Sequence, residues 1–281
     1  MNRLLLIDGS NLLFQMFFGL PEVKVHSKKV VQGTLGFVGG LLKIIRMTSP
    51  SHVLVVFDGE HENPRSQLSS DYKSNREDFT DVEADLNPFS QLDDIYSALD
   101  YLEIAHMETA DCEADDIIAG YCHLFHEEME IVISSMDSDF FQLICDNVRV
   151  LRYHGKNSVI CDVGFVQDRF GIESRQYAEY KALVGDSADN IKGIRGVGPK
   201  TAGMLLREFG SIQGILSNVE LLKRPSLRDA FSQAEQVLDL NMQLIRLNSI
   251  DVLPFPLEEL EYADLSLSSN VVLQAIGLWD D

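Results

Sequence analysis

The sequence predicts an α/β fold in which helices flank a central, mostly parallel sheet, followed by a helical domain. Three short apolar runs end in acidic residues and predict strands that are buried on both faces. They span residues 3–8, 52–58 and 130–139. Helical patterns lie between these runs, and strand alternating with helix is typical of a parallel sheet covered on both sides. They span residues 34–47, 88–102 and 114–125. After residue 163 the amphipathic segments are short and broken by glycines, which predicts helices and no strand before the tail.

These patterns divide the chain into three parts. We expect an α/β domain of residues 1–163, a helical domain of residues 164–255 and an acidic tail of residues 256–281. Weaker strand patterns in the first domain span residues 103–106, 147–153 and 159–162. Residues 59–87 are polar and have no apolar period, and they are longer than an ordinary connection. A loop of that length in a compact domain is usually functional or disordered.

Composition restricts the class of protein. The 281 residues carry a net charge of −21, which argues against a nucleic-acid partner unless a basic groove or bound divalent metal offsets the acids. The four cysteines form no C-x-x-C pair, so neither a zinc site nor a disulfide framework is expected. No signal peptide or membrane-spanning stretch is present. We therefore expect a cytoplasmic protein with reduced cysteines and no membrane partner.

Acidic residues follow several of the predicted strands. Ligands of a parallel sheet bind beyond the carboxyl ends of the strands, so these acids should meet at one edge. They are Asp8, Asp58, Glu113, Asp115, Asp116, Asp137 and Asp139. Any one of them could instead be a helix cap, a first-turn acid or a solvated strand end. Together they predict a site for hard cations, Mg²⁺ or Mn²⁺, and two such ions about 4 Å apart can stabilise the attacking and leaving oxygens of a phosphoryl displacement.

The helical half carries a second pattern. Two more acids, Asp186 and Asp189, precede the glycine-rich stretch GIRGVGPKTA, residues 193–202. Its backbone N–H groups and the following helix N-terminus could bind a phosphate. Basic residues surround this turn in an otherwise acidic chain: Lys192, Arg195, Lys200 and Arg207. The turn could also be a simple helix connector, but its basic surroundings favour contact with a DNA backbone.

Six motifs together resemble one family. LLLIDGSNLLF, VVFDGEHENPR, YKSNR, CEADDIIAG, SSMDSDFFQLI and GDSADNIKGIRGVGPKTA occur between about residues 4 and 215. In this order they are similar to the motifs of bacterial 5′ nucleases, the flap endonucleases and 5′→3′ exonucleases that include the nuclease domain of DNA polymerase I. With no polymerase domain present, the chain resembles the stand-alone members. The resemblance implies a PIN-like or resolvase-like α/β fold with a helix–three-turn–helix domain.

The resemblance also implies a set of metal ligands. The acids that would surround the ion activating water are Asp8, Asp58, Glu113, Asp115 and Asp116. Those that would surround the second ion are Asp137, Asp139, Asp186 and Asp189. Asp8 and Asp116 are expected to be catalytic, together with Lys73 and Arg76, which would contact the scissile phosphate. The implied cofactors are two Mg²⁺ or Mn²⁺ ions and a K⁺ ion at the helix–three-turn–helix motif.

Further residues would bind DNA and potassium. Residues 59–92 would form an arch over the site through which single-stranded 5′ DNA passes. The implied DNA contacts are Arg65, Lys73, Arg76, Lys192, Arg195, Gly196, Gly198, Lys200 and Thr201. The K⁺ ion would bind the backbone carbonyls of Leu183, Val184, Lys192, Ile194 and Val197.

The implied activity is a Mg²⁺-dependent, structure-specific 5′ nuclease of DNA replication or repair. Its substrates would be DNA with 5′ flaps, nicks, gaps or 5′ ends, and RNA–DNA hybrids. We expect a monomer in the bacterial cytoplasm that associates with the nucleoid when it acts. One alternative is a non-catalytic DNA-binding paralogue, although none of the nine acids is missing. Others are a PIN-like ribonuclease, which would lack the motif at residues 185–206, and a D-x-D phosphatase, whose first strand would not end in DGS.

Overall fold

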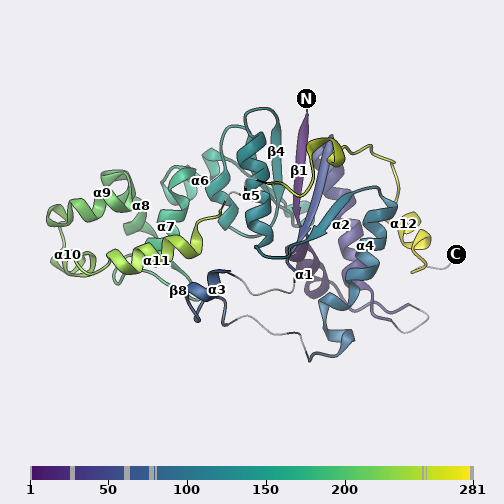
Figure 1. Cartoon of the computed structure of the whole chain (residues 1–281), viewed down its shortest axis with the longest axis horizontal. Coiled ribbons are helices and arrows are strands. Elements are labelled where there is room, and N and C mark those ends of the chain that lie inside the picture. Colours follow the sequence, from purple (N-terminus) through teal and green to yellow (C-terminus); the bar gives the residue numbers. More distant parts are fainter. Residues whose placement is uncertain are drawn as a thin grey trace.

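A six-stranded sheet forms the centre of the N-terminal half in the computed structural model (Figure 1). The strand order is β3-β2-β1-β4-β5-β6, and every pairing is parallel except that of β5 with β6. The strands are β1 (Arg3–Asp8), β2 (His52–Phe57), β3 (Ala105–Glu108), β4 (Glu130–Ser134), β5 (Val148–Arg152) and β6 (Val159–Cys161). The predicted mostly parallel sheet is therefore confirmed.

The structure describes residues 2–25, 29–59, 64–75, 79, 81–248, 250 and 252–278. Arg76, which was expected to contact the scissile phosphate, lies outside these ranges. Within them, no helix is long and apolar enough to cross a membrane.

Both faces of the sheet are covered, which explains why its strands are apolar throughout. Leu4 and Leu6 of β1 point into a core that they share with α5, whereas Leu5 and Ile7 point into the core formed with α1, α2 and α4. All four side chains are fully buried, and each such burial contributes roughly 1.5–3 kcal/mol. The covering helices are α1 (Gly9–Gly19), α2 (Gln32–Thr48), α4 (Leu92–Tyr101) and α5 (Ala114–Phe125).

Helix α1 was not predicted. Its sequence, GSNLLFQMFFG, is apolar on several sides and so lacks the period that marks an amphipathic helix. Its start is nevertheless clear in the structure, because Asp8 at the end of β1 accepts a hydrogen bond from the N–H of Asn11 at 2.9 Å. This N-cap places Asp8 at the junction between the first strand and the first helix.

The C-terminal half is helical and extends away from the sheet, on the left of Figure 1. Its helices are α6 (Val163–Phe170), α7 (Tyr177–Val184), α8 (Pro199–Phe209), α9 (Ile212–Ser217), α10 (Pro225–Phe231) and α11 (Glu235–Ile245). Contrary to expectation, it also contains a small hairpin, β7 (Gly185–Asp186) with β8 (Ile191–Lys192). Strands of two residues are too short to leave an alternating pattern in the sequence.

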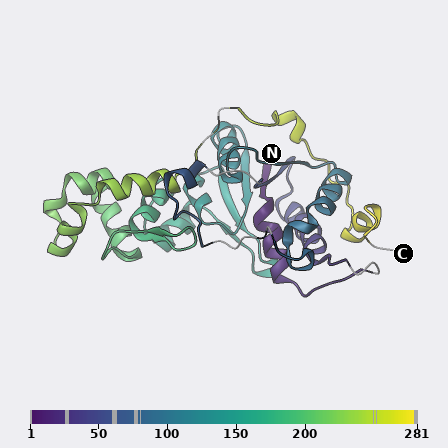
Figure 2. The same ribbon diagram turned by 60° about the horizontal axis from the view of Figure 1, so that its bottom comes forward.

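The loop that was predicted to form an arch begins by docking on this hairpin. After α3 (Pro64–Leu68), the N–H of Lys73 donates to the Asp189 carbonyl at 3.1 Å. The Asn190 side chain donates to the Asp71 carbonyl at 3.0 Å, and the Asn75 side chain to the Ser187 carbonyl at 3.0 Å. Helix α3 itself packs beside α11, as Figures 1 and 2 both show.

The acidic tail returns to the sheet domain. The N–H of Tyr262 donates to the Ser51 carbonyl at 2.8 Å, next to the start of β2. Helix α12 (Ser269–Ala275) then packs against α2 and α4, where Val272 and Leu273 join the buried core. The tail therefore completes one face of the body.

Replacing Leu273 by alanine should destabilise the whole α/β body. Leu273 is 3% exposed, and a buried leucine truncated to alanine costs about 2–5 kcal/mol. Val271 is 40% exposed on the same helix, so Val271→Ala should change the free energy of unfolding by less than about 0.5 kcal/mol. Urea denaturation of both variants checks this. Equal, small effects would mean that α12 does not pack on the body in solution.

Candidate metal centre at the carboxyl edge of the sheet

The acids predicted to form a site do meet at the carboxyl edge of the parallel sheet. Asp8 ends β1 and Asp58 follows β2 directly. Asp137 and Asp139 follow β4, and Asp115 lies in the first turn of α5. Parallel pairing of β2, β1 and β4 aligns their carboxyl ends, so this convergence follows from the topology.

Asp8 is the buried centre of the first acidic group. The hydroxyl of Ser135 donates to its Oδ2 at 2.8 Å and accepts from the N–H of Asp137 at 3.0 Å. Burial, and then the charge of Asp58, raises the pKa of Asp8 to about 7. Ser135 therefore couples the acid of β1 to the acids that follow β4. It was not among the predicted site residues, although it lies within the motif SSMDSD.

Asp115 belongs to the same group. Its pKa is raised well above the ordinary value by burial and by the charges of Asp137, Asp8 and Asp58. Asp58 is exposed, and its Oδ1 accepts a hydrogen bond from the N–H of Ala114 at 2.9 Å, at the N-terminus of α5. These four carboxylates repel one another, and a cation placed among them would relieve that repulsion.

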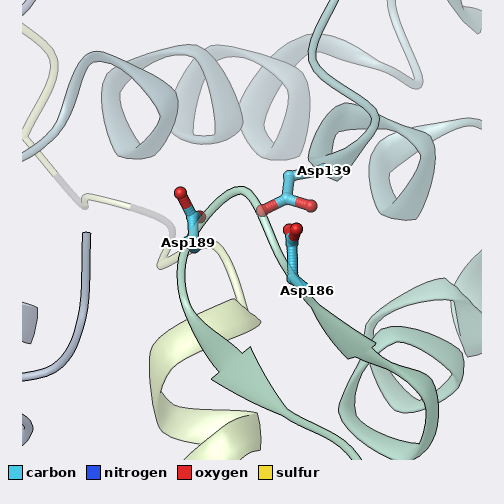
Figure 3. A group of neighbouring side chains, drawn as sticks. All are labelled: Asp139, Asp186 and Asp189. Carbon is cyan, nitrogen blue, oxygen red and sulfur yellow. The ribbon is translucent and has the colours of Figure 1, made fainter. Parts of the chain in front are cut away.

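A second acidic group lies where the sheet meets the helical domain (Figure 3). Asp139, Asp186 and Asp189 each offer an oxygen, and the three oxygens lie within 4.8 Å of one another. Within the described ranges this is the one set of three acidic, histidine or cysteine side chains with that spacing. Burial raises the pKa of Asp139 to about 7. The β7–β8 hairpin thus brings acids of the helical domain to those of the sheet.

A buried lysine, which the sequence did not predict as a site residue, joins this second group. Lys181 on α7 forms ion pairs with both Asp139 and Asp186. Burial would lower the pKa of Lys181, but Asp139 and the acids beside it outweigh burial and raise it. Lys181 likewise outweighs the effect of burial on Asp186, whose pKa is lowered. The signal in the sequence was a charged residue on the buried face of the segment YAEYKALVGD.

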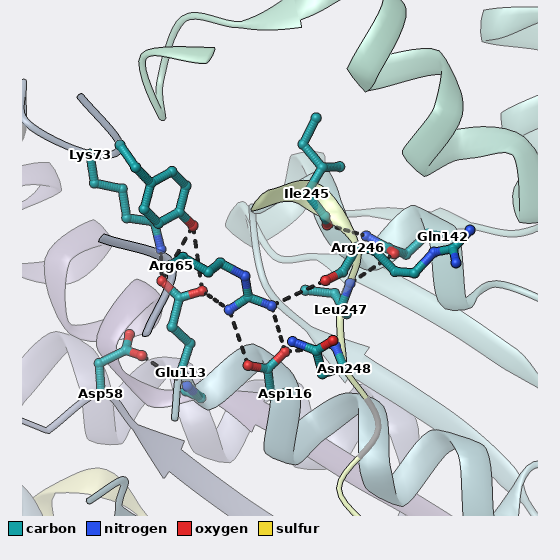
Figure 4. A network of polar contacts seen from close by, with 12 residues as sticks. Asp58, Arg65, Lys73, Glu113, Asp116, Gln142, Ile245, Arg246, Leu247 and Asn248 are labelled. Carbon is teal, nitrogen blue, oxygen red and sulfur yellow. Dashed lines mark hydrogen bonds and ion pairs between the residues drawn. The ribbon is translucent and has the colours of Figure 1, made fainter. Parts of the chain in front are cut away.

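Arg65 connects α3, in the loop that was predicted to form an arch, to the N-terminus of α5 (Figure 4). Its guanidinium donates to the two oxygens of Asp116 at 2.7 and 3.0 Å and also pairs with Glu113. It further donates to the Arg246 carbonyl at 3.2 Å, and the N–H of Asn248 donates to Asp116 at 2.8 Å. Both acids, expected to bind the first ion, are thus engaged by a protein cation.

The expected DNA contact of Arg65 stays a prediction, since the structure shows this side chain paired within the protein. Arg65 was expected to contact DNA, but it is only 4% exposed. Its guanidinium is turned into the protein, toward carboxylates and a backbone carbonyl. The sequence could not show this, because the partners lie about 50 and about 180 residues further along the chain.

Lys73 lies between the two acidic groups. Its ammonium pairs with Glu113, while its backbone N–H donates to the Asp189 carbonyl at 3.1 Å. Its φ of 55° is in the left-handed region, which a lysine rarely adopts. The docking of the arch base on the hairpin holds this conformation and aims the side chain at the site.

The glycine-rich turn of the helical domain is open to solvent. Gly198 is the N-cap of α8, with Pro199 as its first residue, and a Cβ at Gly198 would meet nothing within 4 Å. Gly196 has a φ of 82°, so the turn requires glycine there. Lys192, Arg195 and Lys200 are all exposed beside it. The side chain of Thr201 lies 3.4 Å from that of Arg224.

The carbonyls expected to bind potassium are partly engaged already. Leu183 accepts from the N–H of Ile194 at 2.8 Å, and Ile194 from that of Val197 at 3.0 Å. Lys192 accepts from the Asn241 side chain at 2.9 Å. Val184 is the last residue of α7. Each engaged carbonyl would offer an ion its second lone pair only.

The donors at this edge fit hard divalent cations. The two acidic groups named above offer carboxylate oxygens, which suit magnesium or manganese. Several carboxyls have raised pKa values, and protein cations take up others. Divalent ions bound at this edge would neutralise the excess negative charge of its carboxylates.

Without metal, the free energy of unfolding should fall as the pH rises from about 5.5 to about 8. Asp8 and Asp139 have pKa values of about 7 in the fold, against about 3.9 when unfolded. Between about pH 3.9 and about pH 7 the folded chain therefore binds more protons than the unfolded chain. The free energy of unfolding falls as the pH rises through this range and levels off above about pH 7. The loss should be on the order of 2 kcal/mol per carboxyl at about 1.4 kcal/mol per pKa unit.

Urea denaturation in EDTA at the two pH values measures this slope. Asp8→Asn removes one of the carboxyls whose pKa is raised and should flatten the slope. Stability that rises with pH, or an unchanged slope in Asp8→Asn, would contradict the assignment of raised pKa values to this cluster.

Comparison with known proteins identifies the family. Residues 3–171 match the family described as 5'-3' exonuclease, N-terminal resolvase-like domain, and residues 172–267 match 5'-3' exonuclease, C-terminal SAM fold. The 5'-3' exonuclease of Aquifex aeolicus is 32% identical over 249 residues, covering 88% of this chain and 82% of that protein. The thermostable DNA polymerase I of Thermus thermophilus is 31% identical over 252 residues, and the match covers 88% of this chain but 29% of the polymerase.

Solved structures agree on the fold. T5 5'-exonuclease with bound divalent metal ions (zinc) superposes with a TM-score of 0.72 at 23% identity, covering 88% of this chain and 90% of that one. The catalytic core of Rad2 in complex with DNA substrate superposes with a TM-score of 0.62 at 16% identity, covering 99% and 89%. With both of its domains matched in order, the chain belongs to the 5'-3' exonuclease family of nucleases.

Proposed function

We propose that the chain is a structure-specific 5′ nuclease that hydrolyses DNA phosphodiesters with two divalent ions, Mg²⁺ or Mn²⁺. The observation that carries this proposal is the meeting of two acidic groups from different domains at one edge of the sheet. Asp8, Asp58 and Asp115 would hold one ion. Asp139, Asp186 and Asp189 would hold the other together with Asp137, whose charge acts on both groups.

The positions of the ions and side chains suggest what each would do in the reaction. Bound ions would supply Lewis acidity toward the phosphate and the attacking water. Lys73 would neutralise charge on the scissile phosphate, since its ammonium lies beside Glu113 and its backbone contacts Asp189. Arg65 and Asp116 would fix the position of α3 relative to α5, because the guanidinium donates to both carboxylate oxygens and the pair is buried. Arg76 is proposed to assist Lys73 on the strength of the family resemblance.

The helical domain would grip duplex DNA beside the site. The open N-terminus of α8 offers backbone N–H groups to a phosphate, with Lys192, Arg195 and Lys200 beside it. The relatives support this, since one solved neighbour is the Rad2 catalytic core in complex with DNA substrate. The proposed substrates are DNA with 5′ flaps, nicks, gaps or 5′ ends, with RNA–DNA hybrids as a further class.

Three finer proposals accompany this function. The backbone carbonyls named above would bind K⁺ beside the α8 turn. The protein would act as a monomer, because both acidic groups come from one chain. It would act in the cytoplasm, at the nucleoid. A non-catalytic role would need a broken acidic set, and all nine acids are present.

Cleavage of a labelled 5′-flap DNA tests the reaction. The native chain should cut it in Mg²⁺ and not in EDTA. Asp115→Ala and Asp137→Ala each remove one proposed ligand, so each should slow single-turnover cleavage at least about 100-fold, as when a single electrostatic stabiliser is removed. Both should still bind the flap in Ca²⁺. Glu127 is exposed beyond the other end of α5, so Glu127→Ala serves as the control. Cleavage in EDTA, or full activity of either aspartate variant, would exclude the two-metal assignment.

The duplex grip is tested at Gly198. A valine there fits the free protein, since a Cβ meets nothing within 4 Å, but it would intrude on a bound phosphate. Losing one charge-assisted contact of about 1.5–3 kcal/mol would weaken duplex binding roughly 10- to 100-fold. Gly39 in α2 is equally open, so Gly39→Val controls for the new side chain. Unchanged affinity of Gly198→Val in a fluorescence-anisotropy titration would show that DNA does not contact this turn.

A further inference from the structure

A lysine lies among the carboxylates of the second acidic group. Lys181 reaches from α7 to Asp139 and Asp186 and pairs with both. The side chains of Lys181 and Asp139 are each 9% exposed, and that of Asp186 is 15% exposed. These are buried ion pairs, which salt screens much less than surface pairs.

The ammonium pairs with two of the three carboxylates that a metal would use. Lys181 contacts Oδ1 of Asp139 and Oδ2 of Asp186, in the group whose three ligand oxygens lie within 4.8 Å. Figure 3 shows these carboxylates directed toward one another across the gap between η3 (Asp139–Leu143) and the β7–β8 hairpin. A divalent ion that binds here must displace the ammonium or tolerate a positive charge a few ångströms away.

The lysine also has a structural effect without metal. Three carboxylates this close would repel one another strongly in a buried position. Lys181 offsets that repulsion and connects η3 to the hairpin, so it holds the sheet domain and the helical domain together at the site. Burying a charge is tolerable only when a partner is present, and here each partner is supplied by the chain.

We propose that Lys181 is an internal counter-ion of the second metal site. It keeps Asp139 and Asp186 in place when no metal is bound, and it competes with the divalent ion for their oxygens. The proposal rests on the function proposed above, which assigns these carboxylates to a metal. It gives the second site a weaker affinity than three carboxylates alone would provide, so that occupancy responds to the concentration of free metal.

Mn²⁺ titration followed by electron paramagnetic resonance tests the competition on the full-length chain. Lys181→Met keeps the length of the side chain and removes its charge, and Lys181→Gln removes the charge while keeping a polar end. Each should bind Mn²⁺ about tenfold more tightly at this site, because no buried ion pair has to be broken first. Lys24 also pairs with two acids, Asp85 at 3.0 Å and Glu22 at 3.4 Å, but at the surface. Lys24→Met is therefore the matched control and should bind Mn²⁺ as the native chain does.

Thermal unfolding supplies the second readout. In EDTA both Lys181 variants should melt at a lower temperature than the native chain, and Mn²⁺ should raise their melting temperature by more than it raises that of the native chain. A variant that is unfolded in EDTA but folds on addition of Mn²⁺ also supports the proposal, because the ion replaces the lost charge. Failure of both variants to fold with Mn²⁺ present would overturn it.

Asp186→Asn separates this proposal from the function on which it rests. If the native chain binds no Mn²⁺ that Asp186→Asn loses, the assignment of a metal to this group fails. If Asp186→Asn does lose an ion, but Lys181→Met and Lys181→Gln bind Mn²⁺ no more tightly than the native chain, only the role of Lys181 is refuted. Weaker binding in both would show that Lys181 organises the site without competing for it.

Discussion

Repulsion among carboxylates at one edge of the sheet is the constraint on which the rest of the structure depends. The parallel sheet brings Asp8, Asp58 and Asp137 to that edge, and α5 adds Asp115. Nothing in such a cluster favours folding without a compensating charge. Protonation provides one form of compensation, as the raised pKa of Asp8 shows. Protein cations provide another, and divalent metal would provide the third.

The protein cations also explain how distant segments are joined. Arg65 comes from the arch, contacts the first turn of α5 and also reaches the chain after α11. Lys73 comes from the arch base and contacts both Glu113 and the hairpin backbone. Lys181 joins η3 to the same hairpin. Each ion pair therefore connects separate elements around the site, so these charges also hold the loop that was predicted to form an arch, and the helical domain, against the sheet domain.

Much of the fold and site followed from the sequence because strong local patterns coincided with the topology. Apolar runs predicted the strands, and the rule that strand ends meet at one edge predicted which acids would gather. Helix α1 escaped prediction because it is buried on too many sides to show a period, and the β7–β8 hairpin escaped because it is too short. Lys181 and Ser135 escaped because their roles depend on partners brought close only by the tertiary fold. The partners of Arg65 escaped for the same reason, since a basic residue in a polar loop shows nothing of the carboxylates that the fold brings to it.

A crystal structure with Mn²⁺ soaked in, read from the anomalous signal of manganese, tests most directly whether the clustered carboxylates bind metal. Two peaks are expected at the carboxyl edge of the sheet. One should lie among Asp139, Asp186 and Asp189, and the other among Asp8, Asp58 and Asp115. The first peak should be accompanied by movement of the Lys181 ammonium away from Asp139. No peak at this edge, or peaks confined to acids elsewhere on the surface, would contradict the claim that the clustered carboxylates exist to bind metal.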